Sequence, residues 1–123
     1  MSRGKKAAKQ HRRRVRAIQR ELVSSGIHAR MEAVHKVIDD DAFRERLNRR
    51  IVEVETVSPR RTAEQLRDLA LSMVREQLVD TDGVTLLVFW TPSTRALKLR
   101  VVPAAPELMA AAAKVDARAE DRP

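Results

Sequence analysis

Apolar residues recur every three or four positions along most of the chain, which predicts a largely helical protein. The widest apolar face follows Pro59 and consists of Leu66, Leu69, Ala70, Met73, Val74 and Leu78. Thr62 followed by Gln65 has the spacing of a capping box, so we expect this amphipathic helix to begin at Thr62. The polar segment Asp80 to Gly83 should end it.

Two or three helices are expected before this one. The first carries its apolar residues on one stripe, Ala8, His11, Val15, Ile18 and Leu22, and Gly26 should provide its C-terminal cap. The second has the stripe Ile27, Met31, Val34 and Ile38. The acidic run Asp39 to Asp41 ends that helix or caps the next element.

The segment from Phe43 to Val57 has two interpretations. Phe43 and Leu47 keep helical spacing to about Arg50, but from Ile51 onward the β-branched residues Val52, Val54 and Thr56 alternate with Glu53 and Glu55. Alternation of this kind favours a half-buried strand over 51–57. The alternative is that Ile51 and Val54 extend the helix.

A β-hairpin is predicted after Gly83. The run from Val84 to Trp90 is almost wholly apolar, as expected of a central strand covered on both faces. A four-residue loop, Thr91 to Thr94, follows, in which Pro92 should set a type I turn. Beyond it Leu97, Leu99 and Val101 alternate with Lys98 and Arg100, which is typical of an edge strand.

These elements predict an α+β fold. Two or three N-terminal helices precede the order strand, helix, strand, strand, helix, with a small mixed sheet backed by the amphipathic helix. Pro106 should open the last, alanine-rich helix, which runs to about Arg118. We expect a basic, partly disordered, helix-forming arm over 1–23, one small domain over 24–118 and a frayed tail over 119–123.

Charge is concentrated in the arm. The first twenty residues hold nine of the twenty-five Lys and Arg residues and none of the seventeen Asp and Glu residues. The rest of the chain therefore carries sixteen basic and seventeen acidic residues, so the net charge of +8 comes from the arm. Charge confined to one segment is typical of a contact with a polyanion.

This arm predicts non-specific binding to the phosphate backbone of DNA or RNA. The expected contact residues are Arg3, Lys5, Lys6, Lys9, Arg12, Arg13, Arg14, Arg16 and Arg20. The neutral domain would then mediate protein contacts, as in an accessory protein. The alternative function is that of a structural or assembly protein, whose arm engages an acidic protein partner or a large particle.

Heptad spacing within the arm adds a possible homodimer. Ala8, Val15 and Leu22 lie seven residues apart, so the arm could pair with another helix, including its own copy. Ala8 and His11 would make a poor seam, however. Packing of Ile18 and Leu22 onto the domain is the simpler expectation.

Four potential metal ligands fall on one face of the second helix. His28, Glu32, His35 and Asp39 follow the spacing i, i+4, i+7 and i+11, and imidazole with carboxylate suits Zn or Fe. A single helix supplies ligands but not a closed shell, and no second Glu-x-x-His occurs in the chain. We therefore expect no metal, although these four residues are the candidate ligands.

Catalysis is not expected. The chain has no cysteine and only three glycines, which excludes thiol chemistry and phosphate-cradling glycine loops, and we expect no cofactor. Phe43, Phe89 and Trp90 are the only aromatic residues, and all three lie where a core is expected, which disfavours single-strand stacking. With no apolar run long enough to cross a bilayer, a cytoplasmic location without membrane contact is expected.

Overall fold

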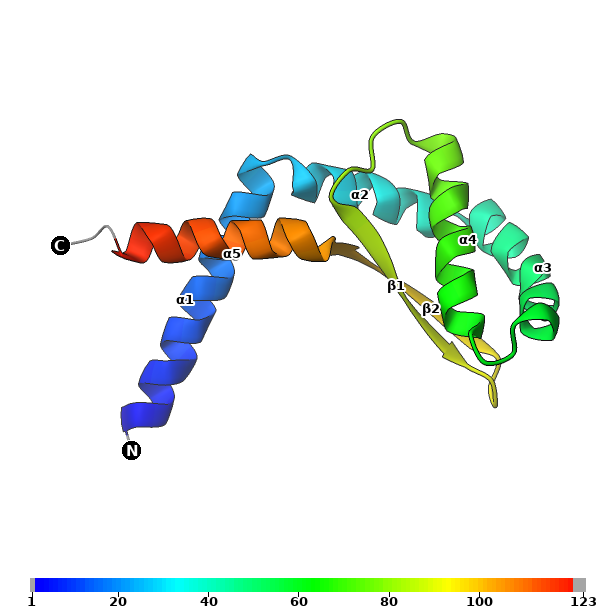
Figure 1. Ribbon diagram of the computed structural model, residues 1–123, viewed down its shortest axis with the longest axis horizontal. Helices are drawn as coiled ribbons and strands as arrows, with labels where there is room; N and C mark the ends of the chain where they lie inside the picture. The colour runs from blue at the N-terminus through cyan, green and yellow to red at the C-terminus, as the bar shows by residue number, and fades with distance from the viewer. Residues whose placement is uncertain (1, 121–123) are drawn as a thin grey trace.

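The computed structural model describes residues 2–120, with side chains for residues 4–119. This part of the chain forms five helices and one two-stranded antiparallel sheet, which confirms the α+β class (Figure 1). In chain order the elements are α1 (Ser2–Ser24), α2 (Ile27–Ile38), α3 (Asp41–Val57), α4 (Thr62–Gln77), β1 (Val84–Thr91), β2 (Ala96–Pro103) and α5 (Ala105–Glu120). Among the described residues, no helix has both the length and the apolar character of a membrane span.

Two short junctions set the N-terminal helices. Gly26 lies between α1 and α2 with a φ of 84°, the left-handed conformation that glycine adopts without a Cβ penalty. Between α2 and α3, the carboxylate of Asp40 accepts a hydrogen bond from the Phe43 backbone N–H at 3.2 Å. Both the glycine stop and the acidic cap are confirmed.

The strand predicted over 51–57 is wrong, because α3 continues through this segment to Val57. Ile51 is buried on the same stripe as Phe43 and Leu47, whereas Val52 is 63% exposed. The alternation of β-branched and acidic residues is therefore the outer surface of a helix. Burial of the helical stripe outweighs the modest strand preference of valine and threonine.

Helix α4 begins at Thr62 as predicted, but without a capping box. The Thr62 hydroxyl lies close to two backbone carbonyls, those of Ser58 and Pro59, at 3.2 and 3.3 Å. It donates toward the preceding turn and so is not the acceptor at the helix start. Arg61 occupies the N-cap position without a side-chain hydrogen bond to the helix.

The sheet is a single antiparallel hairpin, so the predicted mixed sheet is wrong. The strands join through residues 92–95, one position later than expected, and the Arg95 N–H donates to the Pro92 carbonyl at 3.3 Å. Pro92 is thus the first residue of the turn and does not occupy its second position. Arg95 closes the loop with a φ of 55°.

Only one face of the hairpin is covered. Helix α4 packs on β1 and α2 packs on β2, over a face formed by Val84, Leu86, Val88, Trp90, Leu97, Leu99, Val101 and Pro103. The opposite face is open, and both Leu87 and Phe89 are exposed there. The expectation of a strand buried on both faces is therefore wrong, as is the placing of Phe89 in the core.

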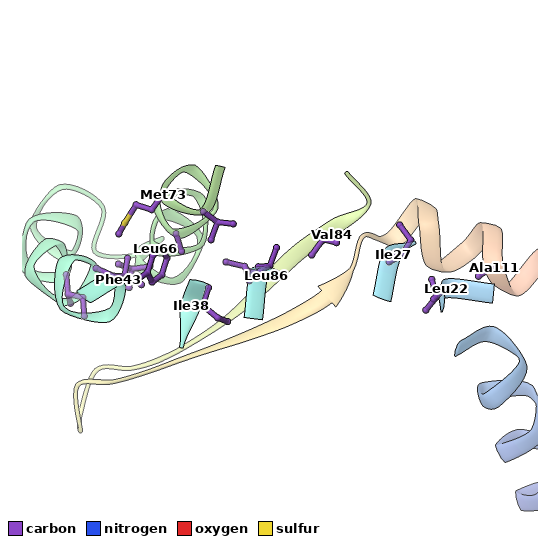
Figure 2. Packing of buried hydrophobic residues seen from close by; sticks show 14 residues of the cluster. Leu22, Ile27, Ile38, Phe43, Leu66, Met73, Val84, Leu86 and Ala111 are labelled. Atoms are coloured by element: carbon purple, nitrogen blue, oxygen red, sulfur yellow. The ribbon is translucent and has the colours of Figure 1, made fainter. Parts of the chain in front are cut away.

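The hydrophobic core runs along α2. Figure 2 shows Ile38, Phe43, Leu66, Met73 and Leu86 gathered where α2, α3, α4 and the hairpin meet. The core continues through Val84 to a smaller group, in which Ile27, Leu22 and Ala111 join α2, α1 and α5. This smaller group holds the two terminal helices in place.

Candidate nucleic-acid interface

Helix α1 carries most of the predicted site residues and crosses α5 (Figure 1). Leu22 is buried and Ile18 packs beside it against the core, so the last turns of α1 are fixed to the domain as expected. Residues 4–16 are exposed throughout. The N-terminal part of α1 therefore extends from the domain with its side chains open to solvent.

Two ion pairs of opposite polarity join α1 to α5. Arg14 donates from Nε to Oδ1 and from Nη2 to Oδ2 of Asp116, each at 3.2 Å. About two helical turns further into the domain, Glu21 pairs with Arg118 of α5. Glu21 is buried, with 8% of its surface exposed, so this second pair satisfies a carboxylate held against the core.

The hydrogen bonds between Arg14 and Asp116 shift the pKa of both side chains. The side-chain hydrogen bond from Arg14, together with its charge, lowers the pKa of Asp116 below its usual value. The same hydrogen bond and the carboxylate charge raise the pKa of Arg14. Arg14 is therefore engaged by a carboxylate of the protein itself and is not freely available to an external anion.

Most other predicted contact residues share a single side of α1. At about 100° of rotation per residue, they fall within an arc of about 120°. This arc, which we call the basic face, is formed by Lys5, Lys6, Lys9, Arg12, Arg13, Arg16 and Arg20. Arg14 lies outside it, toward α5, and the side chain of Arg3 is outside the described residues.

The basic face differs from the rest of the protein in how its charges are compensated. None of its seven side chains takes part in an ion pair within the described residues. Beyond α1, most arginines are paired with carboxylates: Arg30, Arg44, Arg46, Arg49, Arg50, Arg61, Arg67, Arg95 and Arg118. The basic face thus gathers seven unpaired cations on one side of a single helix. The other unpaired cations of the described residues are spread over several elements: Lys36, Arg60, Arg75, Lys98, Arg100 and Lys114.

A groove lies beside this surface, between α1 and α5. Its volume is about 750 Å³, and it is lined by Arg13, Arg14, Ala17, Arg20, Val115, Asp116, Arg118 and Ala119. Four arginines face one aspartate, so the lining is positively charged. The groove brings Arg118, a residue that the sequence did not single out, next to the basic face.

The candidate metal ligands on α2 are not brought together. His28 Nδ1 lies 3.6 Å from Glu32 Oε1, and His35 Nδ1 lies 2.9 Å from Asp39 Oδ2, in two separate pairs along the exposed side of the helix. Nowhere in the described part of the chain do three or more His, Asp or Glu side chains group closely enough to hold a metal ion. These residues act as helix-surface pairs of the i, i+4 type.

Two features of the structure could not be predicted from the sequence. Asp116 lies about a hundred residues from Arg14, so only the crossing of α1 and α5 reveals that they pair. The exposure of Phe89 depends on which hairpin face the helices cover.

Comparisons of the chain with protein-family models, with curated proteins and with solved structures gave no match.

Proposed function

We propose that this protein binds the phosphate backbone of DNA or structured RNA through the basic face of α1. The observation that carries the proposal is the seven cations on one arc of a single exposed helix, none of them paired with a carboxylate among the described residues. Lys and Arg side chains that replace condensed counterions along a nucleic acid gain binding free energy without reading its sequence.

The anchoring of α1 supports the same function. A single helix rich in like charges is marginal in isolation, because nucleation is costly and the arginines repel one another. Here Ile18 and Leu22 fix its last turns to the domain, and Glu21 pairs with Arg118. The end of the basic face nearest the domain is therefore held in place, which lowers the entropic cost of presenting its cations to a phosphate backbone.

The role that follows is that of an accessory factor without catalysis. Backbone contacts position a protein on a duplex but carry no sequence information. Any selectivity would then come from another surface of the molecule or from a protein partner of the domain. An arm that binds an acidic protein surface is the competing function.

A matched pair of triple variants tests the proposal in a gel-shift titration with a 20-base-pair duplex at low salt. K9Q/R12Q/R16Q removes three charges from the basic face, and R46Q/R49Q/R50Q removes three ion-paired charges from α3. We expect the first to weaken binding by at least about tenfold and the second to weaken it much less, since those cations are already compensated.

Equal affinity of the wild-type protein and K9Q/R12Q/R16Q would contradict nucleic-acid binding by α1. In that case, size-exclusion chromatography after nuclease treatment would reveal whether a protein partner or a particle co-elutes with the wild type and is lost with the variant. Full-length variants are preferable to deletion of 1–20, because deletion also removes Ile18 from the core.

A further inference from the structure

The open face of the hairpin presents apolar side chains to solvent. Eight residues alternate with those of the covered face: Thr85, Leu87, Phe89, Thr91, Ala96, Lys98, Arg100 and Val102. Phe89 is 53% exposed and Leu87 is 43% exposed, although both lie in the middle of the strand. Neither side chain belongs to the hydrophobic core or to the partly buried residues that pack against it.

Positive charge lies directly across the hairpin from these two side chains. In the register of the strands, Lys98 is opposite Phe89 and Arg100 is opposite Leu87. Side chains opposite one another in an antiparallel pair have Cβ atoms about 5 Å apart. None of the eight residues is acidic, and neither cation takes part in an ion pair within the described residues.

This composition matches a nucleic acid better than a protein partner. A stable protein interface buries roughly 800 Å² on each side around an apolar centre that is depleted of lysine. Here each of the two large apolar side chains has a cation as its nearest cross-strand neighbour. Proteins that bind single strands combine an exposed aromatic ring for base stacking with cations for the adjacent phosphates.

We propose that the open face of the hairpin binds single-stranded DNA or RNA. An unpaired base stacks on Phe89, and Lys98 and Arg100 bind phosphates on either side of it. The inference rests on the proposed function and deepens it: α1 holds a backbone without regard to sequence, and the hairpin adds a preference for substrates that carry unpaired bases. Charge complementarity between this face and a phosphate chain is what selects the ligand.

Fluorescence anisotropy with a labelled 12-nucleotide single strand and with the corresponding duplex tests this inference. F89A should weaken single-strand binding by roughly 5- to 100-fold, the range expected for loss of one stacked base, and leave duplex affinity within about twofold. F89W, which keeps a ring at this position, should retain single-strand binding. K98Q should weaken it less than F89A does.

Met109→Ala is the matched control, because Met109 is an exposed apolar residue on α5, at 72% exposure. Equal single-strand affinity of F89A and the wild type would overturn the inference, as would equal losses in F89A and M109A. A change in oligomeric state of F89A with unchanged affinity would instead identify a protein interface. Failure of the α1 variants to weaken duplex binding bears only on the proposed function, so the two results are separable.

Discussion

Arg14 and Asp116 form a two-point hydrogen-bonded ion pair across the α1–α5 crossing, with both N–O distances at 3.2 Å. The pair removes one of the nine arm cations from the surface offered to an anion. It also links the basic helix to the last helix of the chain. Since both side chains are about half exposed, the pair controls available charge more than it stabilises the fold.

Neutralising Asp116 should therefore strengthen binding. In D116N, Arg14 is released into the groove that Arg13 and Arg20 line, and one more cation can reach a phosphate. We expect a two- to fivefold gain in duplex affinity at low salt. The slope of log K against the logarithm of salt concentration should increase in magnitude by about 0.9, the value for one additional phosphate contact. The control is D68N, which removes an equal charge from a distant exposed ion pair with Arg67. An equal gain in duplex affinity in D68N would show that the effect arises from net charge alone.

The same pair predicts a dependence on pH. Because the pKa of Asp116 is lowered in the folded protein, the ion pair contributes fully above the ordinary Asp pKa of about 3.9 and is lost as the pH falls through the lower, folded-state pKa. An NMR titration of the Asp116 carboxyl carbon should give a midpoint below about 3.9 in the wild type. R14Q should return it toward the ordinary value, and an unchanged midpoint would argue against the pair in solution.

Alanine substitutions at Ile51 and Val52 test whether residues 51–57 are helical, as in the structure, or form the strand predicted from the sequence. Ile51 is buried, so I51A should lower the free energy of unfolding by about 2–4 kcal/mol through lost burial and a cavity. V52A should change it by less than about 0.5 kcal/mol, because Val52 faces solvent and alanine is the better helix former. Urea unfolding that shows the larger loss at Val52 would favour a strand over 51–57 instead.

Alanine substitutions at Gly26 and Gly83 distinguish the cost of backbone strain from the cost of steric crowding, because both glycines have a positive φ but differ in their surroundings. At Gly26, with a φ of 84°, the nearest atom to an added Cβ is Arg30 Nη2 at 3.6 Å, so G26A should cost about 1 kcal/mol. At Gly83, with a φ of 78°, the Cβ would collide with Ile27 Cδ1 and would lie 2.9 Å from Glu107 Cγ. We expect G83A to cost about 1–3 kcal/mol more than G26A, because the side chains of Ile27 and Glu107 must move, and equal urea midpoints would contradict the docking of α5 beside Ile27.

The sequence predicted most helices because each buries one apolar stripe at regular spacing. It failed over 51–57, where Val52, Val54 and Thr56 follow the local preference of a strand while Ile51 completes the stripe of Phe43 and Leu47. In this segment local residue preference favours a strand, whereas burial of Ile51 favours a helix. The packing of α3 against α4 decides in favour of the helix.

The candidate site was predictable in part. Helical spacing alone places seven cations on one side of α1 and Arg14 outside them, but the pairing of Arg14 with Asp116 depends on where α5 crosses α1. Phe89 was placed in the core because its strand is wholly apolar. An apolar strand does not reveal that its sheet has only one covering layer.

The salt dependence of duplex affinity is the most direct test of the central claim, that the basic face of α1 binds a phosphate backbone. For the wild type, the logarithm of the association constant should fall steeply and linearly with the logarithm of salt concentration. In K9Q/R12Q/R16Q the slope should be smaller in magnitude by roughly 2–3, about 0.9 for each lost phosphate contact. In R46Q/R49Q/R50Q it should be nearly unchanged. A flat wild-type plot, or the same change of slope in both variants, would contradict the claim.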